Sequence, residues 1–292
     1  MRILTVPNWS FGRDAEILGR FEEILRGGNV FLHYLGADVD HNRTVTAFSG
    51  TCDAVEETLF QLSQFAFGRL DMRTHVGVHP RIGAMDVCPF IPLEAGIGPL
   101  TEAKEFAERV GARLADVYGV PVYLYERSER GRHEADLPAL RRGGFEALAG
   151  RELRPDFGPA MVHPRLGVTV LGVRDFLIAF NVNLDTDDLT VARDLAREIR
   201  VYRADGDPRF LGVRALGFPL RSKGLTQVSM NLTLPDVTPV DPIVGWIEAQ
   251  ATELGVDVDS TELIGVIRDR DVLQATELFI RPNQVVTTSH SL

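Results

Sequence analysis

Apolar residues follow helical and strand spacing in turn along the first 125 residues. From Asp14 to Arg26 they recur every three or four positions, and Gly27-Gly28 end the pattern, which predicts a helix. The same spacing predicts helices at 54–70 and 101–118. Short apolar or alternating runs predict strands at 2–6, 30–35, 43–48, 83–91 and 120–125. The predicted order is βαββαβ with one extra strand.

A second series of elements has the same order. Strands are predicted at 176–184, 212–218, 226–234 and 262–267, and helices at 188–201 and 241–254. Two successive βαββαβ units predict an α+β fold of two ferredoxin-like subdomains, with mixed or antiparallel sheets and helices on their outer faces. We place the boundary near Arg174-Asp175, so that the subdomains span residues 1–175 and 176–292. The segment 128–159, rich in Arg, Gly and Pro, is expected to wrap one of them.

Composition narrows the class of protein. The 292 residues are 45% hydrophobic and 25% charged, which excludes intrinsic disorder and allows a full core. The net charge of −10 argues against non-specific nucleic-acid binding. No apolar run approaches the roughly 20 residues that span a bilayer, the N-terminus lacks a signal-peptide pattern, and two cysteines make no zinc motif. We therefore expect a cytoplasmic protein with neither membrane nor nucleic-acid partners.

One hexapeptide occurs twice in the chain. Val78–Gly83 (VHPRIG) recurs as Val162–Gly167 (VHPRLG), each time in a loop immediately before a predicted strand. Proline keeps the preceding histidine extended, with an arginine two positions further on. Similar turns with solvated side chains would have the same pattern, so the repeat alone leaves both a structural and a chemical role open.

His79, in the first copy, has the denser surroundings. Several polar or titratable side chains lie close to it in sequence, namely Arg73, His75, Arg81, Asp86 and Cys88. A zinc site needs three or four converging ligands, and Gly77 and Pro80 prevent the helix that would bring His75 and His79 to one face. Proton transfer is favoured over metal binding, because histidine takes up and returns protons near neutral pH. We expect no metal.

Two further groups of polar residues are candidates for binding. His41-Asn42-Arg43 follows two aspartates, as a polar turn or as a place where Arg43 holds a carboxylate. Amides and a hydroxyl occupy alternate positions of two predicted strands, at Asn181, Asn183, Gln227, Ser229 and Asn231. Alternate positions share one face of a sheet. These residues predict a site for a polar heterocycle or a hydrated contact between subunits.

The chain resembles the formiminotransferase family. The resemblance runs in order from residue 6 to about residue 267, and the stretch His75–Pro92 is highly specific. The matching stretches are Val6–Arg13, His41–Val45, His75–Pro92, Val120–Tyr125, Pro155–Pro159, Leu177–Leu184 and Lys223–Leu232. The cyclodeaminase domain that follows this module in animal proteins is absent from the sequence.

The resemblance implies an activity and a set of roles. The family transfers the formimino group of N-formimino-L-glutamate to N5 of tetrahydrofolate in histidine degradation, with folate in a tunnel between two subdomains of a homodimer. By motif, His79 is implied as the catalytic acid and base. The implied folate-binding stretch comprises Gly158, Pro159, Ala160, Met161, Val162, His163, Pro164, Arg165, Leu166 and Gly167. To these we add Asn181, Asn183, Gln227 and Asn231 for folate, and Arg43 and Arg81 for substrate carboxylates.

Four positions depart from the family's pattern. Phe11, Gly36 and Val78 stand where the family usually has acidic residues, and Arg268 where it tends to have proline. The missing acids leave two alternatives open beside formimino transfer. One is a formyl-transferring relative on the same folate pocket, and the other is a catalytically inactive folate-binding paralogue.

Overall fold

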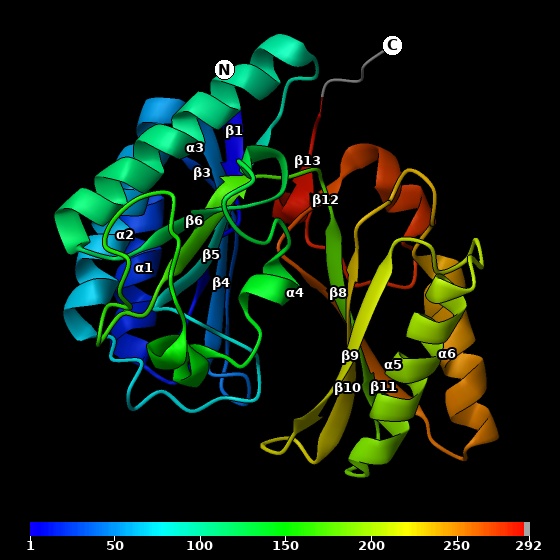
Figure 1. Cartoon of the computed structure of the whole chain (residues 1–292). Helices are drawn as coiled ribbons and strands as arrows, with labels where there is room; N and C mark the ends of the chain where they lie inside the picture. The colour runs from blue at the N-terminus through cyan, green and yellow to red at the C-terminus, as the bar shows by residue number, and fades with distance from the viewer. Residues whose placement is uncertain (289–292) are drawn as a thin grey trace. The chain divides into compact units, whose positions relative to one another are not determined.

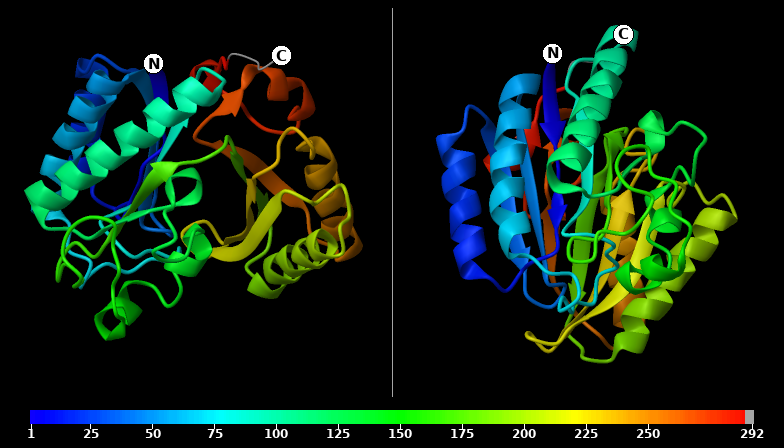
Figure 2. Two further views of the ribbon diagram at one scale, coloured as in Figure 1. Left: turned by 45° about the horizontal axis from the view of Figure 1, so that its top comes forward. Right: turned by 60° about the vertical axis from the view of Figure 1, so that its left-hand side comes forward.

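The computed structural model describes residues 1–288, which form two compact units (Figures 1 and 2). One unit comprises residues 1–175 together with Thr288, and the other comprises residues 176–287. Each unit combines a sheet with packed helices, so the predicted α+β class is confirmed.

The first unit contains a mixed sheet of seven strands. They are β1 (Arg2–Thr5), β2 (Asn8–Trp9), β3 (Phe31–Asp38), β4 (Arg43–Thr51), β5 (Met85–Pro92), β6 (Val122–Leu124) and β7 (Thr169–Val173). β1 and β2 lie one after the other between β4 and β5, separated at Pro7, which has no N–H to donate to a ladder. The pairs β5–β7 and β6–β7 are parallel, whereas all other pairs in this sheet are antiparallel.

Three long helices pack on this sheet, namely α1 (Ala15–Gly27), α2 (Cys52–Arg69) and α3 (Ile97–Tyr118). The side chains of Asp14 and Thr51 cap the first two, each by accepting a backbone N–H of the first turn. α3 begins four residues before its predicted start, because Pro99 falls in the first turn, where its missing N–H costs no helical hydrogen bond.

The segment 128–159 packs against a second, smaller buried cluster in the same unit. Leu148 and Leu153 contribute to this cluster together with Tyr123, Val168 and Val170. The segment contains α4 (Leu137–Leu140) and a 3-10 helix at Phe145–Gly150. It therefore wraps the first unit, as its composition predicted.

The second unit has a four-stranded antiparallel sheet in the order β11-β8-β10-β9. Its elements are β8 (Ile178–Leu184), α5 (Leu189–Ala204), β9 (Val213–Leu220), β10 (Leu225–Leu232), α6 (Asp241–Glu253) and β11 (Val258–Ile264). Apolar side chains of β8 and β10 pack with both helices in one core.

The last strand predicted from the sequence, 262–267, is wrong in its extent. β11 ends at Ile264, because Gly265 adopts a left-handed conformation with a φ of 78°. Ile267 belongs instead to β12 (Ile267–Arg268), which pairs in parallel with β13 (Val285–Val286). Within residues 1–288, no helix is long and apolar enough to span a membrane.

Candidate active site

His79 lies in the loop between α2 and β5, against the turn that joins β3 to β4. Its Nε2 is 2.6 Å from Nη1 of Arg43, and its Nδ1 is 2.8 Å from the carbonyl oxygen of Pro80. A guanidinium can only donate, so Nε2 accepts from Arg43 and Nδ1 carries the ring proton. The geometry therefore holds His79 as a neutral imidazole.

A close approach of two backbones brings the loop and the turn together. A side chain at Gly77 would collide with the carbonyl oxygen of His41, so only glycine fits there. Asn42, with a φ of 48°, ties the turn to both neighbours, because its amide donates to Val76 O at 3.1 Å and accepts from Gly12 N at 2.9 Å. These contacts position Arg43 next to His79.

Electrostatics also favour the neutral form of His79. Burial is the largest cause that lowers the pKa of His79 well below its usual range, followed by the charges of Arg43 and Arg141 and the ring of His41. The rings of His41 and His79 have their centroids 5.7 Å apart. The pKa of Arg43 falls to about 10, because it is buried and repelled by Arg141. The site can thus accept a proton and favours an anionic ligand.

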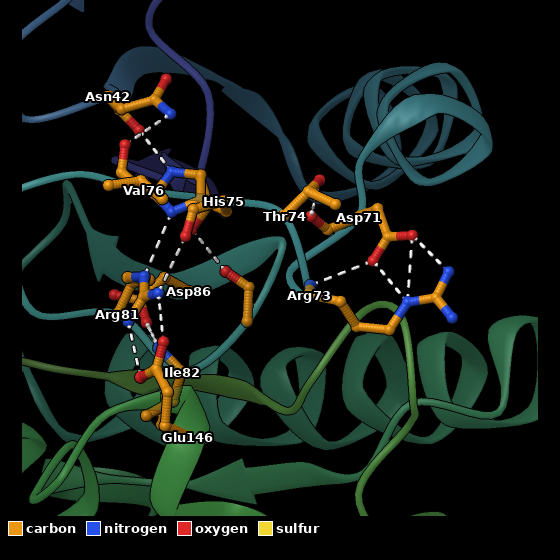
Figure 3. Close-up of polar contacts among 12 residues, drawn as sticks. Asn42, Asp71, Arg73, Thr74, His75, Val76, Arg81, Ile82, Asp86 and Glu146 are labelled. Carbon is orange, nitrogen blue, oxygen red and sulfur yellow. Dashed lines mark hydrogen bonds and ion pairs between the residues drawn. The ribbon is translucent and has the colours of Figure 1, made fainter.

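The guanidinium of Arg81 is paired with protein groups on both sides, and its predicted contact with a substrate carboxylate stays a prediction. Its Nη1 and Nη2 lie 2.9 and 2.6 Å from the two carboxylate oxygens of Glu146, and its Nε donates to Nδ1 of His75 at 3.1 Å (Figure 3). His75 in turn donates from Nε2 to the carbonyl oxygen of Asn42 at 2.8 Å. In the structure Arg81 therefore positions His75 and, through it, the turn that carries Arg43.

Arg141 was missed by the sequence analysis. Its guanidinium pairs with the carboxylate of Asp86, a 3% exposed residue whose other oxygen accepts Ile82 N at 2.7 Å. Arg141 lies in the segment 128–159, which has no clear apolar periodicity and is distant in sequence from His79. The Arg-Arg-Gly-Gly run at 141–144 was the one available signal, since Gly143 and Gly144 both adopt positive φ and turn the chain after Arg141.

The two hexapeptides lie next to each other in the first unit. Gly83 and Gly167 form an antiparallel bridge, Ala84 N donates to Leu166 O at 2.9 Å, and Val168 N donates to Ile82 O at 3.0 Å. The two histidines differ in their contacts, because Nδ1 of His163 accepts the backbone N–H of Arg165 and of Leu166. His163 therefore stabilises its own turn, while His79 faces Arg43.

The stretch proposed for folate is accessible over its first half. Gly158, Pro159, Ala160 and Met161 are exposed, Val162, His163 and Arg165 are half-buried, Pro164 is exposed, and Leu166 and Gly167 are buried. Arg165 also donates to the carbonyl oxygen of Leu70 at 3.0 Å, so it holds the end of α2. None of these residues belongs to the group of side chains around His79.

The polar residues of the second unit form one hydrogen-bonded network. Gln227 Nε2 donates to Asn183 Oδ1 at 2.9 Å, and Asn181 and Asn183 both donate to the carboxylate of Glu262. They lie on the sheet face opposite the core of α5 and α6, with Gln227 and Asn183 each 1% exposed and Asn231 exposed. Gln227 Oε1 is buried and has no hydrogen-bond partner in the described part of the chain.

Each departure from the family's pattern has a local structural setting. Phe11 is buried edge-on against Phe21, with their ring centroids 5.0 Å apart, where a carboxylate would lack a partner. The space above Gly36 is filled by the phenol of Tyr34, so an acidic side chain does not fit without moving that ring. Val78 is 39% exposed. Arg268 is buried between Asp236 and Asp271.

We find no group of three or more His, Cys, Asp or Glu side chains placed to hold a metal ion in the described residues. The sequence prediction of a metal-free protein is not tested by this observation and stays a prediction.

Comparisons with known proteins agree with the motifs. Residues 2–174 match the model of the formiminotransferase domain, N-terminal subdomain, and residues 179–291 match that of the formiminotransferase domain. Glutamate formimidoyltransferase of Streptococcus pyogenes serotype M1 is 32% identical over 94% of this chain and 92% of its own length. The enzyme of the same name from Thermoplasma acidophilum is 32% identical over 95% and 92%.

Longer relatives match over their transferase part. Formimidoyltransferase-cyclodeaminase of Sus scrofa is 38% identical over 94% of this chain but only 51% of its own length. Taken with the two family models, which together cover nearly the whole sequence, these matches establish that the chain belongs to the formiminotransferase family.

Proposed function

We propose that this protein is a glutamate formimidoyltransferase that moves the formimino group of N-formimino-L-glutamate to N5 of tetrahydrofolate. The observation that carries the proposal is the neutral imidazole of His79, which accepts a hydrogen bond from Arg43 and lies within the electrostatic influence of Arg141. Such a site combines a proton acceptor with positive charge for a dicarboxylate donor. The relatives named for this activity support it. They give no support to the formyl-transferring and inactive alternatives.

The reaction needs one proton to be moved. N5 of tetrahydrofolate forms a bond to the amidine carbon of the donor and must lose its proton, and the bond from that carbon to the glutamate nitrogen then breaks as this nitrogen gains a proton. We assign both transfers to His79, which accepts the proton from N5 and returns it to the departing amine, so that no proton is gained or lost overall. General acid–base catalysis of this kind contributes about 10²–10⁴ in rate.

We assign folate binding to the residues of the resembling motifs, Gly158–Gly167 in the first unit and Asn181, Asn183, Gln227 and Asn231 in the second. The buried oxygen of Gln227, which lacks a partner within residues 1–288, fits the N–H donors of a pterin. The exposed residues Gly158–Met161 fit the less polar middle of the molecule. No metal is needed for the transfer, because protonation of the amidine nitrogen already makes the amidine carbon electrophilic.

We further propose that each unit is a ferredoxin-like subdomain, with the boundary after Asp175. Support comes from the strand order of the four-stranded sheet, β11-β8-β10-β9, which is that of a βαββαβ repeat. In the first unit, β3, β4, β1 and β5 follow the same order, with β7 and β6 added beyond β5. The folate tunnel, the homodimer and the cytoplasmic location remain predictions.

The activity can be tested directly. Purified protein is incubated with tetrahydrofolate and N-formimino-L-glutamate and then acidified, and the absorbance of methenyltetrahydrofolate is read. We expect a signal that requires both substrates and is lost in His79→Ala. His33→Ala is a matched control, because His33 is a buried histidine of β3 that bonds to Ser49 Oγ at 2.8 Å and takes no part in the proposed chemistry. A signal that persists in His79→Ala would overturn the assignment of His79.

A further inference from the structure

Both ring nitrogens of His79 are engaged by other groups of the protein. Nδ1 donates to Pro80 O, and Nε2, the nitrogen that can accept a proton, is covered by Nη1 of Arg43 at 2.6 Å. An N–H of an attacking amine cannot reach Nε2 while the guanidinium occupies this position. Arg43 must therefore move away from Nε2, far enough for another N–H group to take its place, before His79 can act as a base.

The positive charge of Arg141 repels the positive charge of Arg43. The two guanidiniums are close enough for Arg141 to lower the pKa of Arg43, and the charges of Asp38 and Asp86 and the phenol of Tyr34 oppose this effect. Asp38 is also bonded to the backbone N–H of His41 at 2.7 Å, and Asp86 pairs with Arg141. Arg43, His79 and Asp86 line the same cavity, and Arg141 pairs with this Asp86, so both guanidiniums lie at the His79 site.

Arg141 has donor capacity left. Its Nε is buried and has no hydrogen-bond partner among residues 1–288, although its guanidinium pairs with Asp86. Arg141 lies on the segment 137–146, which contacts the His79 loop through a hydrogen bond and an ion pair. Phe145 N donates to Arg81 O at 2.9 Å, and Glu146 pairs with Arg81. The segment therefore places Arg141 at the site as a rigid cation.

A carboxylate is the anionic group that a guanidinium binds best, because two parallel N–H groups can donate to its two oxygens. If the protein has the proposed function, its donor has two carboxylates. The α-carboxylate is attached to the same carbon as the reacting nitrogen, so it must lie within a few bond lengths of the group that His79 protonates. The γ-carboxylate is separated by two further carbons and can bind elsewhere.

We propose that Arg43 and Arg141 bind the α-carboxylate of the donor, and that this contact draws Arg43 away from Nε2 of His79. Arg141 is then a substrate-binding residue, and Arg43 both binds substrate and uncovers the base. The inference rests on the proposed function for the identity of the donor. It makes proton transfer dependent on a correctly bound α-amino acid derivative.

Histidine NMR tests the proposal without turnover. The ring signals of His79, identified by their loss in His79→Gln, are titrated alone, with N-formyl-L-glutamate, and with N-formyl-4-aminobutyrate, which lacks only the α-carboxylate. We expect N-formyl-L-glutamate to raise the pKa of His79 by about one unit or more, because a carboxylate neutralises the cations beside it. N-formyl-4-aminobutyrate should leave it unchanged. Equal shifts with the two ligands, or no shift with either at saturation, would overturn the proposal.

Steady-state kinetics provide the second readout. Arg141→Gln should raise the KM for N-formimino-L-glutamate about 10- to 100-fold, as expected for a lost charge-assisted hydrogen bond, and Arg141→Lys should recover part of the loss. The matched control is Arg142→Gln, an exposed neighbour in the same segment, which should behave as wild type. An unchanged KM in a folded Arg141→Gln variant would overturn the role of Arg141. Failure of the proposed function would differ, because the wild type itself would then give no transfer.

Discussion

Gly83 and Gly167 meet as an antiparallel bridge, so the two copies of the hexapeptide end against each other. A Cβ on Gly83 would run into the carbonyl oxygen of Val168, and one on Gly167 into that of Ile82. Gly167 also has a φ of 75°, which other residues adopt only with strain. The repeated glycine is thus explained by close backbone packing, whereas the repeated histidine has two different roles.

We predict that Gly83→Ala and Gly167→Ala both lower the free energy of unfolding, the second by the larger amount. Left-handed strain costs of order 1–3 kcal/mol, and the steric collision adds to it. Urea unfolding followed by circular dichroism measures the effect. Gly19→Ala in α1 is the control, because nothing lies within 4 Å of the added methyl, and alanine in a helix should stabilise by about 0.5–1 kcal/mol. If all three variants unfolded alike, the tight bridge would be contradicted.

The elements were largely predictable because periodicity is a local property. Both βαββαβ series follow from apolar spacing, including α1, whose predicted 14–26 agrees with Ala15–Gly27. The start of β11 was missed because three polar residues, 259–261, follow Val258 at an edge of the sheet, where apolar alternation is weak. Arg43 and His79 were found through motifs, but their direct contact was not.

Arg141 and Glu146 could not be found in the same way. They reach the His79 loop from a segment more than 50 residues away, through ion pairs with Asp86 and Arg81. Ion pairs across such distances in sequence leave no periodic trace. The sequence therefore assigned Arg81 to a substrate carboxylate, while the structure gives it Glu146 as a partner.

Stability should fall as the pH drops below about 6.5, the ordinary pKa of histidine. The pKa of His79 is lowered by burial and by Arg43 and Arg141, so below this pH the unfolded chain binds a proton that the folded chain does not. The slope from one such group is at most about 1.4 kcal/mol per pH unit. His79→Gln should give a shallower decline between pH 6.5 and 5.5, measured as free energies of unfolding in urea at each pH.

His133 provides the control of opposite sign. Burial lowers its pKa, but the hydrogen bond from its Nε2 to Asp156 at 2.7 Å outweighs burial and raises it. The stabilisation from His133 is fully present below about pH 6.5 and is lost as the pH rises through the raised pKa. His133→Gln should therefore remove a gain in stability that occurs on acidification down to about pH 6.5, and leave the decline between pH 6.5 and 5.5 unchanged. Identical pH profiles for the two variants would contradict the protonation state given to His79.

Gln227 tests the folate assignment in the second unit. We predict that Gln227→Leu weakens the binding of tetrahydrofolate, because it removes the buried oxygen that lacks a protein partner within residues 1–288. We expect the Kd for tetrahydrofolate to rise about 10-fold, because the loss of one hydrogen bond weakens the binding free energy by about 1.4 kcal/mol. Titration calorimetry gives the affinity, and Ser222→Leu, exposed in the turn between β9 and β10, is the control. Unchanged affinity in Gln227→Leu would remove this residue from the folate site.

Arg268, where the family tends to have proline, should be structurally essential in this chain. It is 3% exposed, donates from Nε to Asp271 Oδ2 at 2.6 Å and from Nη2 to Asp236 Oδ1 at 2.9 Å. We predict that Arg268→Met destabilises the protein by about 3–5 kcal/mol, because the carboxylate of Asp271, only 8% exposed, would lose its buried cationic partner.

The double variant Arg268→Met/Asp271→Leu separates the charge from the packing. Removing both partners leaves no uncompensated buried charge at residue 271, so most of the lost stability should return. Arg270→Met is the matched single variant, because Arg270 pairs with Asp236 at 3.0 Å on the surface, where such a pair is worth about 0–1 kcal/mol. Thermal unfolding followed by circular dichroism ranks the three. If the double variant were no more stable than Arg268→Met, the loss would come from packing of the arginine side chain against Phe176 rather than from the buried carboxylate.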